Sequence, residues 1–442
     1  MISKFRFNPS WLYCLLFYPL MGSAQTSDSA VLSHASLPNV IAYALKNQPV
    51  IKQSLIDEQL VETSLRNKLS AWYPQLNLNY NLQHNFQVPT NIIGGNPVRL
   101  GVNNTSNAQF TVSQSIFNRD ALLANRSKED VRTQARQNTG VNKIELVSNV
   151  SKAFYDVLAT QQQIRVTDEN ISRLENSLKI ASSQYNAGIV DKTDYKRATI
   201  QLNNTRATRS ANTALLDAKL VYLKALIGYP DSLTLQLEYD TLQLEKEATL
   251  DTLMRPDITQ RIEFRLLNTQ RRLLAANLQY EKWSYLPSVS LNGAYNMNYQ
   301  NNQFGKLYSN NFPNSFAAIS LSFPIFQGGK RKANIEQAEW QLKRNDEDIN
   351  KLRNNISSQY AQAMAAYKSN RANFLALREN LALAKEVYGI IEMQYKAGVK
   401  TYLEVLTAET DLRTSQINYY NALYQVLASK VDVQKALGEI TY

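Results

Sequence analysis

The sequence predicts a membrane protein of the α+β class, in which very long helices continue a short set of membrane strands. Two proline-free stretches are long enough for helices of about 100 Å. Four short segments alternate apolar and polar side chains residue by residue. The second half of the chain repeats the pattern of the first, which indicates an internal duplication. Residues 25–442 are therefore expected to form one unit made of two repeats, at about 36–228 and 251–438.

The N-terminal segment has the pattern of a secretory signal peptide. An apolar run from Trp11 to Leu20 follows two basic residues, and small residues precede a cleavage site after Ala24. We therefore expect residues 1–24 to be removed. Cys14, the only cysteine, lies in this segment without the small residues of a lipoprotein site, so we expect a mature chain with no thiol and no lipid anchor.

The composition argues against several classes of protein. After residue 24 no window approaches the roughly 20 apolar residues of a membrane-spanning helix. The 48 Lys and Arg residues are scattered among 37 Asp and Glu residues, so we expect no nucleic-acid partner. His34 and His84 are far apart in the sequence, and the GGKR segment at Gly328 lacks the spacing of a phosphate loop. We therefore expect that the protein is not an enzyme and that it binds neither a cofactor nor a metal ion.

Two long helices are predicted from the distribution of proline. Proline is absent between Pro97 and Pro230 and again after Pro324, and proline is the residue that breaks a helix interior. Residues 118–187 and 327–397 would each span about 105 Å, which exceeds the core of an ordinary domain. In the second stretch apolar residues recur every seven positions in two adjacent columns. This spacing predicts coiled-coil packing against more than one helix, with an isolated two-helix coiled coil as the simpler alternative.

The duplication is clearest where each long helix would end. The segment SQYNAGIVDKTDYKRA at 183–198 aligns without gaps with MQYKAGVKTYLEVLTA at 393–408. The register then persists for about 40 residues, to the glycines at 228 and 438, which is too long for chance. Each half is therefore expected to contain a helix, a strand pair, a long helix, a turn and another helix.

Four segments alternate apolar and polar residues with a period of two. They lie at about 72–85, 107–117, 287–299 and 315–323. Alternation over about ten residues is typical of transmembrane barrel strands. The segments between paired strands, 86–106 and 300–314, are rich in Asn, Gly and Pro and are expected to be extracellular loops.

The alternation assigns the strand residues to two faces. The candidates for the lipid-facing side are Leu76, Leu78, Leu291 and Tyr295. The candidates for the lumen-facing side are Asn77, Asn79, Asn81, Asn292 and Asn296. A soluble sandwich with one wet face is the alternative, but the polar face is amide and hydroxyl with almost no charge.

Four strands cannot close a barrel by themselves. An open sheet edge in hydrocarbon leaves backbone groups unpaired, at several kcal/mol each. Two copies would give eight strands around a filled interior, whereas three would give a 12-stranded β-barrel with a lumen. The pattern therefore predicts a homotrimer, with its long helices forming a hollow coiled-coil barrel in the periplasm.

Several motifs together resemble the TolC or outer-membrane factor family. They are the doubled tip motifs, the Trp-Tyr-Pro and Tyr-Leu-Pro segments at 72–74 and 285–287, PIFQGG at 324–329 and ALG at 436–438. The resemblance covers essentially the whole mature chain. It implies a trimeric outer-membrane exit duct that extends into the periplasm, with a belt supplied by residues 229–256. It also implies a periplasmic adaptor protein and an inner-membrane pump as partners.

The resemblance further implies that the helix tips close the periplasmic entrance. Gly188 and Gly398 fall at the tip turns, where an adaptor would dock. The implied gate residues are Thr193, Asp194, Tyr395, Lys400 and Glu404. Tyr395 and Lys400 would bond to Thr193 and Asp194 on a neighbouring coil, and Glu404 would form an acidic ring. Replacing Glu404 is then expected to leave the closure links intact.

The residues alone also allow a simpler interpretation of this region. Thr401 and Glu404 have the spacing of a capping box, and Asp194 lies in a first helical turn, where the helix dipole favours a carboxylate. Capping and gating are compatible roles, so both stay open.

Two other classes of protein compete with the duct. A periplasmic coiled-coil adaptor or scaffold would lack the four strands, and a simple porin would lack the long helices. Within the duct hypothesis, efflux of drugs, metals or other small molecules and type I protein secretion both remain open, because a passive polar pipe takes its specificity from the pump.

Overall fold

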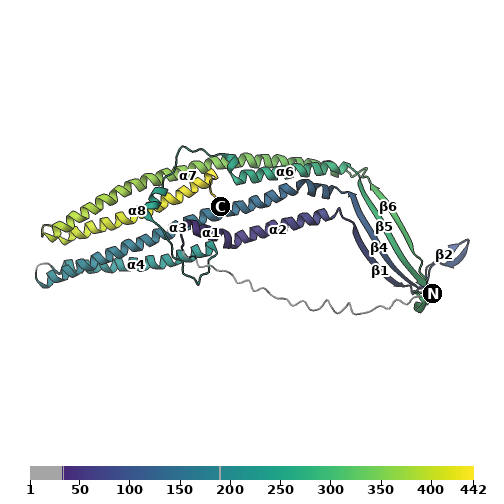
Figure 1. The fold of residues 1–442 in the computed structure, drawn as a ribbon, viewed down its shortest axis with the longest axis horizontal. Coiled ribbons are helices and arrows are strands. Elements are labelled where there is room, and N and C mark those ends of the chain that lie inside the picture. Colours follow the sequence, from purple (N-terminus) through teal and green to yellow (C-terminus); the bar gives the residue numbers. More distant parts are fainter. Residues whose placement is uncertain (1–31, 33, 189–190) are drawn as a thin grey trace.

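The computed structural model describes residues 32, 34–188 and 191–442. The predicted signal peptide at 1–24, with Cys14, lies outside these residues. Figure 1 shows an elongated molecule in which long helices lie side by side and a sheet turns away from their axis at one end. Within the described ranges, no helix is both long and apolar enough to cross a membrane.

The two halves of the chain have the same order of main elements. The first contains α1 (Leu37–Asn47), α2 (Pro49–Ser70), β1 (Gln75–His84), β4 (Asn104–Phe117), α3 (Arg119–Asn186) and α4 (Lys192–Ile227). The second contains α6 (Ile262–Lys282), β5 (Ser288–Asn301), β6 (Asn314–Ser322), α7 (Lys330–Lys396) and α8 (Tyr402–Leu437). Apart from α1 and a small hairpin within residues 86–106, each half therefore consists of a helix, two strands, a long helix and a second helix.

The long helices α3 and α7 contain 68 and 67 residues. The side chain of Asn118 caps α3 by accepting a hydrogen bond from the Asp120 N–H at 2.8 Å. Along α7 the residues that are buried recur largely at the predicted heptad positions: Ile349, Ile356, Tyr367, Phe374 and Leu381. The repeating apolar columns thus face the neighbouring helices, as coiled-coil packing requires.

The four-stranded sheet is antiparallel and has the order β1-β4-β5-β6. Helices α2, α3, α6 and α7 contact one another in the corresponding order. Each strand is therefore joined along the chain to one of these helices, and the four helices follow the same order as the four strands. In the part of the chain that the structure describes, β1 and β6 are edge strands with a partner on one side only.

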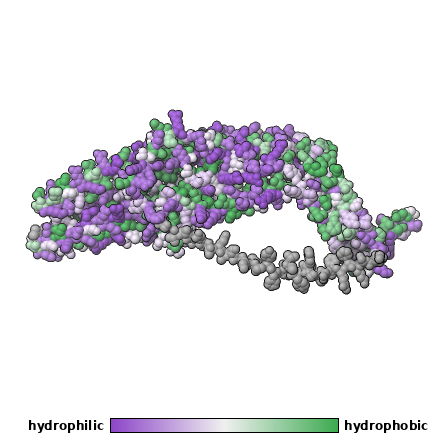
Figure 2. Space-filling model, in the orientation of Figure 1, coloured by the Kyte–Doolittle hydropathy of each residue, from purple (hydrophilic) through white to green (hydrophobic). Residues whose placement is uncertain are grey.

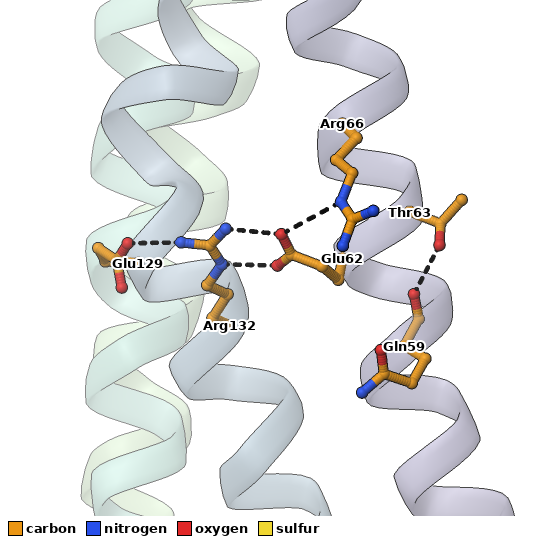
Figure 3. A network of polar contacts seen from close by, with 6 residues as sticks. All are labelled: Gln59, Glu62, Thr63, Arg66, Glu129 and Arg132. Atoms are coloured by element: carbon orange, nitrogen blue, oxygen red, sulfur yellow. Dashed lines mark hydrogen bonds and ion pairs between the residues drawn. The ribbon is translucent and has the colours of Figure 1, made fainter.

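An ion pair joins the first two helices of this layer. Arg132 on α3 donates from Nε and Nη2 to the two carboxylate oxygens of Glu62 on α2, at 2.7 and 2.8 Å. Its Nη1 donates to Glu129 at 2.7 Å, as Figure 3 shows. All three nitrogens of this guanidinium donate a hydrogen bond, so the Arg132 side chain is well satisfied.

The segment 86–106 differs from the predicted loop. It contains a hairpin formed by β2 (Thr90–Ile93) and β3 (Asn96–Arg99), which projects beyond the sheet in Figure 1. Gly94 and Gly95 make its turn with φ of 60° and 87°, values that glycine adopts at little cost. In the sequence, the Gly-Gly pair after Ile92 and Ile93 is the feature that could have predicted this hairpin.

Other boundaries also differ from the sequence-based expectation. β1 begins only at Gln75, after a turn, and β4 begins at Asn104. β5 extends to Asn301, inside the predicted loop 300–314, which also holds a short 3-10 helix. The linker 229–256 contains α5 (Thr241–Glu247) and a parallel bridge from Leu237 to Ala35. The linker 229–256 and the predicted loop 300–314 therefore contain more regular structure than their composition suggested.

Candidate channel wall and periplasmic gate

The sheet separates the predicted lipid-facing and lumen-facing residues completely. In register, Leu78 is opposite Phe110, which is opposite Tyr295, while Asn79 is opposite Gln109, which is opposite Asn296. Because side chains alternate along a strand, all four apolar candidates lie on one face and all five asparagines on the other. The pairing of the strands thus brings together residues that are more than 200 positions apart.

The apolar face is open to the surroundings of the subunit. Leu78 is 59% exposed and Ile319, on the same face, is 72% exposed. In Figure 2 hydrophobic residues gather over much of the sheet, whereas hydrophilic residues predominate over the helices. A surface of this kind is unfavourable in water and calls for lipid or protein contact.

The polar face is joined across its strands by side-chain hydrogen bonds. Asn296 donates from Nδ2 to Asn314 Oδ1 at 2.6 Å, and Asn292 donates to Ser320 Oγ at 3.1 Å. Asn107 likewise donates to Asn298. This surface can line a water-filled channel with uncharged hydrogen-bonding groups. It offers no charged group that would select one solute over another.

The two helix tips end in glycine turns. Gly188 and Gly398 have φ of 72° and 76°, the left-handed conformation in which a helix commonly ends. A Cβ built at either glycine would meet no atom within 4 Å, so the turns are open. Val399, beside the second turn, is 72% exposed. The tips therefore present an accessible surface for another molecule.

The structure gives Tyr395 a bond that the sequence did not predict. Its hydroxyl donates to Gln184 Oε1 at 3.2 Å, which ties the end of α7 to the end of α3. The pKa of Tyr395 is raised by burial and then by the negative charge of Asp194, so these two predicted gate residues do lie near each other. Thr193 uses its backbone N–H to bond to Asp191, the N-cap of α4. Within the subunit, Gln184 is thus the hydrogen-bond partner of Tyr395.

The signal for Gln184 was already in the repeated motif. Gln184 and Tyr185 in the first repeat align with Gln394 and Tyr395 in the second. The contact therefore pairs one half of the motif with the other, and only the three-dimensional structure, which brings the ends of α3 and α7 together, could show that.

Lys400 and Glu404 form one unit with the capping residue Thr401. The Lys400 ammonium donates to Glu404 Oε1 at 2.6 Å, while the N–H and hydroxyl of Thr401 donate to Oε2 at 2.9 and 3.0 Å. The capping box is confirmed, since the Glu404 N–H also donates to the Thr401 hydroxyl. These donors, Lys400 first, lower the pKa of Glu404 to about 2.

This geometry corrects one expectation. Replacing Glu404 was expected to leave the closure links intact, but Glu404 itself holds Lys400. Replacing Glu404 by glutamine therefore also removes the ion pair that holds the Lys400 ammonium group.

Among residues 32, 34–188 and 191–442, no group of three or more His, Cys, Asp and Glu side chains could hold a metal ion. The features that remain are an apolar sheet face, a neutral polar face and a polar cluster at the helix tips. Together they define a membrane channel protein with a long helical extension.

Comparison with known proteins places the chain in a family. The family model described as outer membrane efflux protein matches residues 40–229 and 262–439, so the chain belongs to the outer membrane efflux protein family. This confirms the resemblance found in the sequence, and with it the location in the outer membrane with helices that extend into the periplasm. The unmatched residues between the two segments include α5.

Individual relatives match over most of their length. The outer membrane protein TolC of Escherichia coli is 21% identical over 438 residues, which cover 95% of this chain and 86% of TolC. The probable efflux pump outer membrane protein TtgC of Pseudomonas putida is 26% identical, over 86% of this chain and 82% of its own. These relatives are outer-membrane efflux proteins, which fits a protein that is not an enzyme.

Solved structures have the same fold. A membrane protein from Pseudomonas aeruginosa superposes with a TM-score of 0.73 at 20% identity, covering 91% of this chain and 93% of that one. The channel CusC superposes with a TM-score of 0.72 at 19% identity, covering 91% of both chains. At this level of identity the likeness shows the fold alone.

Proposed function

We propose that this chain is one subunit of a homotrimeric, passive exit duct across the outer membrane and periplasm. The observation that carries the proposal is the pair of edges, β1 and β6, on a sheet whose apolar face is exposed. Backbone groups on such edges cannot stay unpaired in hydrocarbon, so other copies must supply their partners.

Three copies satisfy these edges with a lumen inside. Pooling four strands from each gives a 12-stranded barrel, whose interior is wide enough for solute. Each β1 and α2 edge would meet the β6 and α7 edge of the next copy, which is a head-to-tail contact that closes into a ring. Apolar side chains that are exposed on these two helices, Ile56 and Leu60 on α2 and Trp340 on α7, would become buried there.

The rest of the chain takes its role from this arrangement. The repeats at about 36–228 and 251–438 supply equivalent halves from an internal duplication, and the linker 229–256 forms a belt around the helical barrel. The asparagine face lines the lumen, and the apolar face contacts lipid. The segments 86–106 and 300–314 lie on the extracellular side, hairpin included.

The tips would carry the gate and the docking site. The residues Thr193, Asp194, Tyr395, Lys400 and Glu404 hold the periplasmic entrance closed, in addition to the capping role of the Thr401 box. A periplasmic adaptor docks at the open turns of Gly188 and Gly398, and an inner-membrane pump delivers the cargo. The names of relatives support small-molecule efflux, since one is an antibiotic efflux pump protein and another a toluene efflux pump protein. Type I protein secretion is the second candidate, because the neutral lumen wall does not exclude it.

The proposal is tested by the assembly state and by conductance. The protein should extract with outer membranes in mild detergent, have the mass of a trimer by light scattering, and form pores in planar bilayers. A monodisperse monomer in mild detergent would contradict the pooled barrel. A protein recovered from the periplasmic fraction would instead support the coiled-coil adaptor or scaffold.

A further inference from the structure

A carboxylate is buried where the two helix pairs meet above the tips. Glu409 on α8 is 2% exposed. Its Oε1 accepts hydrogen bonds from Asn170 Nδ2 at 2.9 Å and from Arg173 Nε at 3.3 Å, and both donors are on α3. A buried acid costs free energy unless its partners compensate fully, so its presence in a helix interface requires an explanation.

The pairing around Glu409 is incomplete. Both donors approach the same oxygen, and Arg173 contributes a single long bond while its Nη2 is buried without a partner. Asn170 donates with its amide nitrogen, but its Oδ1 is also buried without a partner. The contrast is with Arg132, which holds both oxygens of Glu62 (Figure 3). An unused acceptor thus lies on the amide group that already binds the acid.

A protonated Glu409 would suit this environment better than an ionised one. The acid could then donate its O–H to Asn170 Oδ1 while still accepting from Nδ2, which completes a two-bond pair between acid and amide. Burial raises the pKa of Glu409, and Arg173 offsets that rise only in part. The proton comes from the solvent, and no other group has to change its charge.

The other groups that face Glu409 do not titrate in the same range. They are Arg173 on α3, Tyr388 on α7, and Tyr402 and Arg413 on α8. Arginine side chains are not deprotonated in proteins. Burial raises the pKa of Tyr388 to about 12 and also raises that of Tyr402, so both phenols stay neutral.

Glu409 is also close to the gate residues along its own helix. It follows Tyr402, the first residue of α8, by two helical turns, or about 10 Å. The ring of Tyr402 lies 6.2 Å from that of Tyr395, and Lys400 and Glu404 precede and follow Tyr402. A shift of α8 against α3 would therefore move the tip contacts.

We propose that Glu409 is a proton-linked positioning residue of the periplasmic gate. In its protonated form Glu409 makes two hydrogen bonds to Asn170, which hold α8 against α3 and keep the entrance closed. In its ionised form this contact is weaker and the entrance opens more readily. The inference rests on the proposed function, because it assigns a regulation to the same gate.

The direction of the pH effect follows from proton linkage. In the open state α8 separates from α3 and Glu409 is hydrated, so its pKa returns toward the ordinary value of 4.5. The closed state, with the raised pKa, then binds more protons than the open state. Lowering the pH toward that ordinary value therefore favours the closed state, and raising the pH through the raised value favours the open state.

The test measures conductance of the purified trimer in planar bilayers at about pH 7.5 and about pH 5. We expect the open probability of the wild type to fall about threefold or more in acid, since three copies add their effects. Glu409→Gln keeps both hydrogen bonds as an amide pair and cannot ionise. At both pH values it should therefore conduct like the wild type at about pH 5.

A matched control uses another acid on the same pair of helices. Asp432 on α8 pairs with Lys152 on α3, and its side chain is 44% exposed. Asp432→Asn should keep the wild-type pH dependence. Asn170→Leu, which removes the amide, should weaken closure in acid, and it decides the matter if Glu409→Gln does not assemble.

Two results would overturn the inference and leave the duct intact: a wild-type trimer whose conductance does not depend on pH in this range, or a Glu409→Gln trimer with the wild-type dependence. The absence of any conducting trimer would overturn the proposed function, and this inference with it.

Discussion

The two ends of the molecule are stabilised in opposite ways. At the sheet, the apolar side chains are exposed, and β1 and β6 are edge strands whose outer backbone groups have no strand partner among the described residues. At the helix tips, polar side chains bond to each other within the subunit, as Tyr395 does to Gln184 and Lys400 to Glu404. The sheet thus depends on what surrounds it, whereas the tips are nearly self-sufficient.

This difference indicates that the sheet determines assembly and that the helix tips determine opening and closing. Apolar burial and strand pairing are strong and not easily reversed, so they suit a permanent wall. Single hydrogen bonds and exposed ion pairs contribute only about 1 kcal/mol or less each, so they suit a contact that must open and close. Substitutions at the sheet should therefore affect assembly, and substitutions at the tips should affect conductance.

The largest effect is expected from charge on the apolar face of the sheet. Leu78→Arg and Leu291→Arg should prevent formation of the trimer, because a charge in mid-membrane costs about 2–4 kcal/mol on the lipid side, and each trimer holds three copies. Asn79→Arg and Asn292→Arg, one position further along the same strands, should assemble normally. Trimer yield in outer-membrane extracts measures the effect, and equal tolerance on both faces would show that the faces have been assigned wrongly.

A smaller effect is expected from the tip bonds. Tyr395→Phe together with Lys400→Ser should leave the trimer intact and raise its conductance in planar bilayers. Loss of the Tyr395 bond to Gln184 should cost about 1 kcal/mol in each subunit, and threefold symmetry multiplies this to about 3 kcal/mol. Tyr185→Phe is the matched control, since this tyrosine occupies the equivalent place in the other repeat. A double variant that conducts like the wild type would place the gate elsewhere.

Much of the framework could be predicted because it depends on local pattern. The absence of proline and the heptad columns predicted α3 and α7 to within a few residues, and the alternation in β1 and β5 assigned their faces correctly relative to each other. These features depend on backbone chemistry and side-chain period, which a single segment carries by itself.

The contacts of the tips could not be predicted in the same way. Glu409 looks like an ordinary exposed acid on a helix until α3 is packed against it, and Gln184 has no visible role until α7 lies beside it. The Lys400–Glu404 pair is predictable from the sequence, since the two residues are four positions apart, whereas the family resemblance implied contacts between neighbouring coils. Long-range packing decided these partners.

The smallest and most specific effect is expected from Glu404→Gln. The carboxylate is ionised at neutral pH, and Lys400 and Thr401 lower its pKa from the ordinary 4.5 to about 2. Its contacts are therefore complete above about pH 4.5 and are lost only as the pH falls toward about 2. Glutamine can still serve in the capping box, so α8 should keep its N-terminus and the trimer its stability.

The Glu404→Gln change removes three negative charges from the constriction and releases Lys400, so the preference for cations over anions should fall while conductance rises slightly. Reversal potentials in a salt gradient measure this preference. Glu62→Gln, which removes an ionised carboxylate far from the tips, should leave the reversal potential unchanged. If Glu404→Gln also leaves it unchanged, Glu404 is a helix cap and does not line the aperture.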